Sequence, residues 1–285
     1  MKPIVAVIAP GNMGAAVGAR LVERGAQVCT LLEGRSQASV QRAVKAGMTD
    51  ADDATIAQSD IILSIVPPGD ALALAERLAP ALRATSKKPV YVDCNAVSPQ
   101  TAEKIAAVIS ATGSAFVDGG IIGGVPRAGY AGPQIYVSGP DAGRVEALIE
   151  YGLAIRPMDG PLTAASALKM SYGGITKGVT AICSAMVLAA QRGGVADALQ
   201  REFAESQPML AAHFARTLPD MFGKAYRWVA EMEEVADFTG TDAERDMYQG
   251  IAALYRRIAD DVDGGKKEVG VLADFSTATK GAAKP

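Results

Sequence analysis

Residues 3–14 read Pro-Ile-Val-Ala-Val-Ile-Ala-Pro-Gly-Asn-Met-Gly, and this stretch decides the fold of the chain. Its first half, Pro3–Ile8, is a short apolar run typical of a buried strand, and residues 15–24 have the pattern of a helix. Gly11 and Gly14 lie between the two. A strand, a glycine turn and a helix in this order favour a turn that binds the phosphates of a dinucleotide.

The two glycines have separate physical roles in such a turn. Gly11 lets the backbone approach a pyrophosphate, Gly14 lets the helix lie close on the strand, and the helix N-terminus offers N–H groups to the anion. Ala9 stands where the usual pattern has its first glycine, so an ordinary strand-to-helix turn is the alternative. The flanking strand and helix favour nucleotide binding, and the expected cofactor contacts here are Gly11, Asn12, Met13 and Gly14.

Length and composition limit the class of protein. A chain of 285 residues suits about two domains. The net charge of −3 shows no basic excess, so nucleic acid is not an expected partner. The N-terminus lacks a signal pattern, and no run of about 18 uncharged apolar residues predicts a membrane span. We therefore expect a cytoplasmic globular protein that does not associate with a membrane.

Cysteine and histidine usage excludes several chemistries. Cys29, Cys94 and Cys183 lie in apolar segments without the spacing of metal ligands, which predicts buried thiols in a reducing compartment. His213 is the only histidine, so neither a metal cluster nor a Ser-His-Asp relay is expected. Proton chemistry must then use lysine, tyrosine, a carboxylate or water.

Strand and helix patterns alternate through the first half of the chain, which predicts an α/β fold with a mostly parallel sheet. Residues 1–160 are expected to form a Rossmann dinucleotide-binding domain. The expected strands are Pro3–Ile8, Gln27–Leu32, Asp60–Ile65, Val90–Asp93, Ala115–Asp118, Gln134–Ser138 and Leu153–Pro157. Expected helices between them include Asp70–Leu82, Pro99–Ala111 and Pro140–Tyr151.

Strand signals stop near Leu162, so residues 161–285 are expected to form an all-helical domain. A long apolar helix is predicted over Leu162–Gln191, and the tail Ser276–Pro285 is expected to be loosely held. Shorter helices are predicted over Val195–Glu205, Pro208–Thr217, Ala225–Phe238 and Asp242–Asp260. The helices expose more apolar surface than one small domain hides, which predicts a homodimer built through this domain.

Ligands of an open α/β sheet bind beyond the carboxyl ends of its strands, so the residues that follow each strand are candidates. After the second strand, Glu33 suits the adenosine ribose hydroxyls of NAD, whereas Arg35 with Ser36 suits the 2′-phosphate of NADP. The two signals compete, and we lean toward NADP over NAD. After the third strand, Val66 and Pro67 form a stiff apolar turn that can pack on the dinucleotide.

Two later strand ends complete the predicted site. Asn95 follows the fourth strand and is expected to bond the nicotinamide ribose. Four glycines lie within residues 119–124, which we interpret as a backbone that approaches a ligand closely.

Lys169 is the expected proton donor and acceptor. Helical spacing puts it on one face with Gly173, Thr176 and Thr180, and Tyr172 lies beside them. A lysine with such small neighbours either extends to solvent or is held in a pocket, where desolvation suits it to acid/base work.

These segments, in this order, resemble the β-hydroxyacid dehydrogenase superfamily, which includes 3-hydroxyisobutyrate and 6-phosphogluconate dehydrogenases. Residues 9–14 look like that family's Gly-Leu-Gly-x-Met-Gly turn, and residues 93–99 look like its Asp-Ser-Ser-Thr-x-x-Pro segment. Residues 118–124 resemble its substrate-binding Asp-Ala-Pro-Val-Ser-Gly-Gly stretch. Lys169 falls where the family has its catalytic lysine. The resemblance implies substrate contacts by Ile122, Gly123, Gly124 and Gly173.

The departures concern the substrate. Ile122 occupies the place of the family's substrate-carboxylate serine, and Gly173 that of an asparagine one helical turn after the lysine. The family's late Lys-Asp pair has no clear match in residues 232–234. Residues 119–126 are also similar to imine reductases, and the second half resembles a bacterial subgroup of 6-phosphogluconate-dehydrogenase-like proteins with its own C-terminal domain.

The sequence therefore predicts an NAD(P)-dependent oxidoreductase with its active site in a cleft between the two domains. Hydride is expected to move between nicotinamide and a small hydroxy acid or its carbonyl counterpart, with Lys169 as general acid/base. Tyr172 is the second candidate donor. An imine reductase and a dinucleotide-binding protein without turnover are the alternatives.

Overall fold

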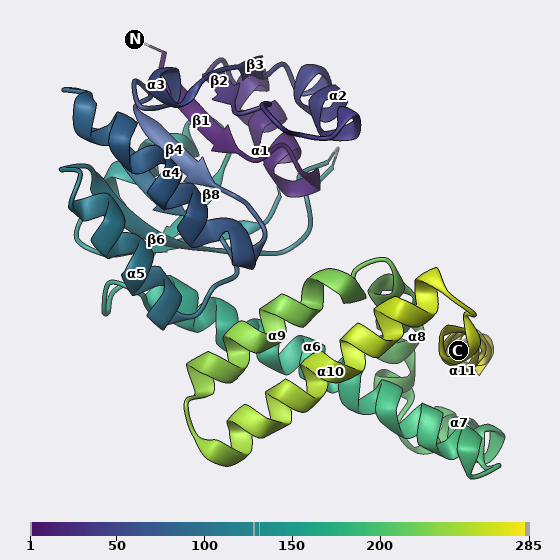
Figure 1. Ribbon diagram of the computed structural model, residues 1–285. Helices are drawn as coiled ribbons and strands as arrows, with labels where there is room; N and C mark the ends of the chain where they lie inside the picture. Colours follow the sequence, from purple (N-terminus) through teal and green to yellow (C-terminus); the bar gives the residue numbers. More distant parts are fainter. Residues whose placement is uncertain (1, 128, 131, 283–285) are drawn as a thin grey trace. The chain divides into compact units, whose positions relative to one another are not determined.

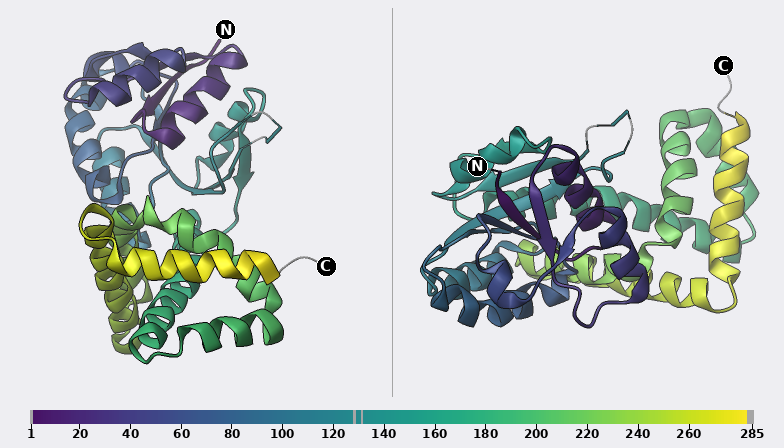
Figure 2. Two further views of the ribbon diagram at one scale, coloured as in Figure 1. Left: turned by 90° about the vertical axis from the view of Figure 1, so that its right-hand side faces the viewer. Right: turned by 90° about the horizontal axis from the view of Figure 1, so that it is seen from above.

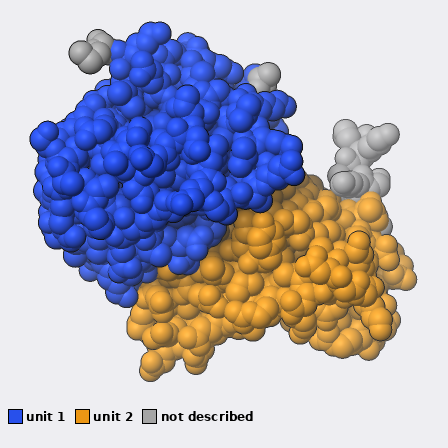
Figure 3. Space-filling model, turned by 45° about the horizontal axis from the view of Figure 1, so that its top comes forward, with its two compact units in different colours: residues 1–170 blue, residues 171–285 orange. Residues whose placement is uncertain are grey.

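The structure is a computed structural model that describes residues 2–127, 129–130 and 132–282. The chain forms two compact units, residues 1–170 and residues 171–285 (Figure 3). The first unit holds the sheet and the second is built of helices (Figure 1).

The first unit is built on one eight-stranded sheet, ordered β3-β2-β1-β4-β5-β6-β7-β8. Neighbouring strands are parallel except β6 and β7, which are antiparallel. The chain crosses from one side of β1 to the other after β3, so the carboxyl ends of β1 and β4 flank the point where the strand order reverses. The strands are β1 (Ile4–Ile8), β2 (Gln27–Thr30), β3 (Thr49–Asp50), β4 (Ile61–Ser64), β5 (Val90–Asp93), β6 (Ala115–Ile122), β7 (Gln134–Ser138) and β8 (Ala154–Pro157). The predicted α/β fold with a mostly parallel sheet is confirmed, and its first six strands have the order of a Rossmann domain.

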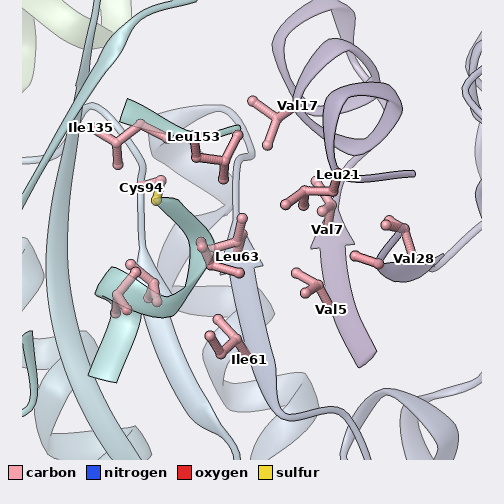
Figure 4. Packing of buried hydrophobic residues seen from close by; sticks show 14 of the residues in the cluster. Val5, Val7, Val17, Leu21, Val28, Ile61, Leu63, Cys94, Ile135 and Leu153 are labelled. Atoms are coloured by element: carbon pink, nitrogen blue, oxygen red, sulfur yellow. The ribbon is translucent and has the colours of Figure 1, made fainter. Parts of the chain in front are cut away.

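Helices cover both faces of this sheet (Figure 2). Strand β1 alternates between two cores: Val5 and Val7 belong to one hydrophobic cluster, and Ala6 and Ile8 to the other. Figure 4 shows the first cluster, in which Val17 and Leu21 of the first helix pack on the strand. The helical elements are α1 (Asn12–Glu23), α2 (Gln37–Lys45), α3 (Asp53–Ile56), η1 (Pro68–Asp70), α4 (Ala71–Ala84), α5 (Pro99–Ser110) and η2 (Ala142–Ile149).

The second unit is helical throughout the part described. Helix α6 (Ala164–Arg192) begins in the first unit and continues into the second. After it come α7 (Ala196–Ser206), α8 (Pro208–Phe222), α9 (Ala225–Thr239), α10 (Asp242–Asp263) and α11 (Lys267–Ala282). Helices α9 and α10 form an antiparallel pair (Figure 1), joined through Gly240 in the left-handed conformation at φ 68°.

Several local predictions differ from the structure. The sequence does not predict strand β3 or helices α2, α3 and α11: β3 and α3 are short, α2 is short and mostly polar, and the apolar residues of α11 show little helical periodicity. The helix expected over Pro140–Tyr151 is present as the 3₁₀ helix Ala142–Ile149. The tail expected to be loosely held, Ser276–Pro285, begins within α11, which extends to Ala282, and residues 283–285 lie outside the described part.

Helix α6 has the length and composition of a membrane span, and it is the one such helix among the described residues. Half of its most apolar window is buried inside the protein.

Candidate functional site

The glycine turn lies at the carboxyl end of β1, where Gly11 is the residue before α1. A Cβ added at Gly11 would meet no atom within 4 Å, whereas one added at Gly14 would collide with the carbonyl oxygen of Ala9. No side chain caps α1 at Gly11. The open space over Gly11 and the uncapped helix N-terminus fit a pyrophosphate. Asn12 is exposed beside this space, and Met13 packs partly against the core.

Glu33, the acidic residue after β2, forms an ion pair with a residue of helix α4. Arg77 of α4 donates to Glu33 Oε2 at 2.8 Å, and its Nε donates to both carboxylate oxygens of Asp53 at 3.0 Å. The Glu33 side chain is thus largely exposed but paired with the Arg77 guanidinium.

A third residue, Arg42, joins the predicted pair Arg35 and Ser36 after β2, and it was not predicted from the sequence. Ser36 caps α2 by accepting a hydrogen bond from the amide of Ser39, and the half-buried Arg35 comes just before it. Arg42, on the next turn of α2, donates through Nη2 to Ser39 Oγ at 2.9 Å. Its Nε donates to the carbonyl oxygen of Pro10 at 3.1 Å, so its guanidinium is held against the glycine turn.

Asn95 links the ends of β4 and β5. Its Oδ1 accepts from the amide of Val66 at 2.6 Å, while its Nδ2 donates to Ser64 Oγ at 2.8 Å and to Asp93. The side chain is buried, and its hydrogen bonds fix the Val66 turn. Pro67 is exposed at the tip of that turn.

The four glycines of residues 119–124 divide into two pairs. Gly119 and Gly120 lie inside β6, and Cβ atoms there would crowd the carbonyl oxygens of Asp93 and Ala165. The first pair therefore serves internal packing, which corrects the expectation that all four admit a ligand. Gly123, at φ 126°, and Gly124 are exposed beyond the strand, next to the half-buried Ile122.

Lys169 is held at the end of β6. The missing side chain at Gly120 lets α6 cross close over this strand. The half-buried Lys169 then donates from Nζ to the carbonyl oxygen of Ile121 at 2.7 Å. The ammonium therefore lies beside residues 122–124, at the carboxyl edge of the parallel part of the sheet.

A buried carboxylate anchors the start of the same helix. Asp118 of β6 accepts from the amide of Ser166 at 2.7 Å and from its hydroxyl at 2.6 Å. Burial raises the pKa of Asp118 to about 6, and the hydrogen bonds from Ser166 oppose that rise.

Tyr172 and Gly173 follow on α6 and belong to the second unit. Tyr172 is half exposed, and Gly173 is buried against a carboxylate of α9. Among the described residues, no group of three histidine, cysteine or carboxylate side chains is arranged to hold a metal ion. Most of the other predicted site residues follow β1, β2, β4, β5 and β6, whose carboxyl ends share one edge of the sheet.

Comparison with known proteins agrees with this arrangement. Residues 4–149 match the NAD binding domain of 6-phosphogluconate dehydrogenase, and residues 190–258 match a domain of unknown function, DUF1932. A solved protein of unknown function, described as structurally similar to 3-hydroxyacid dehydrogenases, is 31% identical. That match covers 90% of this chain and 97% of the other, with a TM-score of 0.68.

Two further relatives are named enzymes. A 3-hydroxyisobutyrate dehydrogenase of Pseudomonas aeruginosa is 29% identical over 49% of this chain and 47% of its own. An imine reductase of Myxococcus stipitatus, solved with NAD+, shares the fold at 21% identity. Its TM-score is 0.56, and the match covers 96% of this chain and 99% of that one. The glycine turn, the strand order and the family match over residues 4–149 together show that this chain belongs to the β-hydroxyacid dehydrogenase superfamily, in a subgroup with its own helical C-terminal domain.

Proposed function

We propose that this protein is an NAD(P)-dependent oxidoreductase acting on a small β-hydroxy acid or its carbonyl counterpart, with Lys169 as general acid/base. The observation that carries the proposal is the hydrogen bond from Lys169 Nζ to the carbonyl oxygen of Ile121. This bond holds the ammonium at the sheet edge where ligands of this fold bind. A lysine so oriented can give a proton to a developing alkoxide or take one from an alcohol.

The cofactor would be held at the glycine turn, with its pyrophosphate in the space over Gly11. When bound, it supplies or accepts the hydride. The turn of Val66 and Pro67, which Asn95 fixes, would pack on the dinucleotide. Gly14 supports the site indirectly, because its missing side chain lets α1 pack against the end of β1.

NADP is the preferred form in this proposal. Arg35 and Ser36 lie at the start of α2 and Arg42 on its second turn, so a 2′-phosphate bound there would find charge-assisted hydrogen bonds. The repulsion expected from Glu33 is reduced by its ion pair with Arg77. Both features support NADP over NAD.

The substrate would contact the backbone at Gly123 and Gly124, next to Ile122. An isoleucine offers no hydrogen bond to a carboxylate, so the exposed amides beyond β6 are the donors that this segment retains. Tyr172 would be a second donor and Gly173 a second contact, because both follow Lys169 within about one turn of the same helix.

A panel of substrates with NADP+ or NADPH, followed by nicotinamide absorbance, tests this proposal. We expect turnover of at least one β-hydroxy acid, with 3-hydroxyisobutyrate, glycerate and L-serine as first probes. Reduction of cyclic imines without oxidation of any acid would instead make the protein an imine reductase. Cofactor binding without any turnover would make it a binding protein.

We further propose a cytoplasmic homodimer formed through the helical unit. Ile175, Ile182 and Met186 of α6 are exposed by 67%, 59% and 56%. Their spacing places them in one stripe along the helix. An apolar groove between α6 and α10 continues this surface, with Met247 and Leu254 among its lining residues. Light scattering at micromolar concentration should give twice the mass of the chain.

A further inference from the structure

The start of α6 is fastened to the sheet by side chains of two strands. Ser138 of β7 accepts from the amide of Ala165 at 2.9 Å and donates to the carbonyl oxygen of Leu162 at 2.9 Å. Asp118 of β6 accepts both donors of Ser166. These partners satisfy amides of the first helical turn, which have no acceptor within the helix.

The two strand residues are fully buried and are themselves paired across the sheet. Asp118 and Ser138 are register partners on β6 and β7, and the Ser138 hydroxyl lies 3.4 Å from Asp118 Oδ2. A buried carboxylate at a helix N-terminus also interacts favourably with the helix dipole. The helix therefore has a fixed starting point and a fixed rotation relative to β6.

That starting point sets the position of Lys169. Lys169 lies three residues after Ser166, about one helical turn, so a shift of the first turn moves its side chain directly. The carbonyl that receives its ammonium, on Ile121, lies three residues after Asp118 on the same strand. Both ends of the Lys169 hydrogen bond are thus tied to one carboxylate.

We propose that Asp118 is a positioning residue for Lys169, acting through Ser166 with the support of Ser138. The proposal rests on the proposed role of Lys169 in proton transfer. Asp118 accepts hydrogen bonds from the amide and the hydroxyl of Ser166. These bonds fix the axial position and the rotation of the first turn of α6 and therefore the position of Lys169.

The test measures the chemical reactivity of the Lys169 amine and does not require turnover. Brief labelling of the intact protein with acetic anhydride, read by peptide mass spectrometry, gives the reactivity of Lys169 relative to the exposed Lys104 in the same sample. We expect Asp118→Asn and Ser166→Ala to raise this ratio at least threefold. Ser166→Thr keeps the hydroxyl and should return the ratio to the wild-type value.

A matched control is Asp141→Asn, which removes an exposed carboxylate paired with Arg144 and should leave the ratio unchanged. If Asp118→Asn fails to fold, Ser166→Ala decides, since it removes one hydroxyl and keeps the amide donor. An unchanged ratio in Ser166→Ala and in any folded Asp118→Asn overturns the assignment, as does a Ser166→Thr variant that behaves like Ser166→Ala.

Turnover separates this inference from the proposed function. With an acid that the wild type oxidises, Asp118→Asn and Ser166→Ala should each lower kcat at least tenfold and leave the KM for NADP+ within twofold of the wild-type value. A changed labelling ratio in a protein that oxidises no acid supports the positioning role and overturns the proposed reaction. An unchanged kcat in a variant with changed labelling overturns the role of Asp118 in the reaction.

Discussion

The ammonium of Lys177 on α6 is bonded to the carboxylate of Glu231 on α9, and the two side chains are only 14% and 12% exposed. The same ammonium lies 5.5 Å from the centre of the Trp228 ring. A Cβ added at Gly173 would lie only 3.1 Å from Glu231 Oε1, closer than an ordinary contact. Gly173 therefore leaves room beside the ion pair that joins two helices of the second unit.

Breaking this pair should cost stability, whereas replacing it should not. Glu231→Leu leaves a buried lysine without its carboxylate and should lower the free energy of unfolding by about 3–5 kcal/mol. Lys177→Met combined with Glu231→Leu should recover most of that loss, because no charge stays buried. Urea unfolding of the two single variants and the double variant measures the coupling.

The control is Glu233→Gln, whose carboxylate pairs with Arg256 at the surface and should contribute at most about 1 kcal/mol. A double variant as unstable as the worse single variant would show that the pair is not the source of the loss.

The two glycines of the turn should respond in opposite ways. Gly14→Ala places a Cβ against the backbone of Ala9 and should lower the free energy of unfolding by about 2 kcal/mol or more. Gly11→Val has room and an ordinary φ of −69°, so its stability should change by about 1 kcal/mol at most. Its side chain occupies the proposed pyrophosphate space, so NADPH binding measured by calorimetry should be lost. Unchanged affinity in Gly11→Val would contradict the nucleotide site.

Arg42 should decide cofactor preference together with Arg35. Arg35→Ala and Arg42→Ala should each weaken NADPH binding about tenfold, since charge-assisted hydrogen bonds contribute about 1.5–3 kcal/mol. NADH binding should change less than threefold for Arg35→Ala. Arg42→Ala also frees the carbonyl of Pro10, so a modest loss of NADH affinity is expected there. Equal losses for both cofactors in Arg35→Ala would remove the basis for the NADP preference.

The glycine turn and the sheet could be predicted because their signals are local. Strand β1, the Gly11 turn and α1 are contiguous, and the buried strands are apolar runs. Strand β6 was predicted to end at Asp118 because two glycines follow it, yet it continues to Ile122 through its pairing with β7. Those glycines make room for Asp93 and Ala165, which are distant in sequence.

The positions of the site side chains also depend on contacts that are distant in sequence and so could not be predicted locally. The side chain of Asn95 is directed inward by Val66, 29 residues earlier, and Arg42 reaches Pro10, 32 residues earlier. Neither contact can be predicted from the residues that neighbour Asn95 or Arg42 in the sequence. Ser36 is an N-cap that accepts a hydrogen bond from the amide of Ser39, and a serine at this position is a signal that could have predicted α2 and hence the position of Arg42.

Asp118 should make stability fall as the pH rises. Its pKa is raised by burial to about 6, above the ordinary value of 3.8, so the folded state binds its proton more tightly than the unfolded state. The contribution is therefore complete below about pH 4 and is lost as the pH rises to about 6. Relative to Asp118→Asn, the wild type should lose stability across that window, by at most about 1.4 kcal/mol per pH unit. Denaturation at pH 4.5, 5.5, 6.5 and 7.5 measures the difference, and a difference that rises with pH contradicts the assignment.

Lys169→Met is the sharpest test of the proposed reaction. Methionine keeps much of the side-chain volume and removes the ammonium that donates to Ile121. General acid/base groups contribute about 10²–10⁴-fold, so kcat should fall at least about a hundredfold. Cofactor affinity should change little, because the glycine turn and the start of α2 are untouched. The matched control is Lys104→Met, at an exposed residue of α5, which should retain wild-type kcat. If Lys169→Met lost less than fivefold on a substrate that the wild type turns over, the lysine would be structural. Tyr172→Phe would then be the variant expected to abolish turnover.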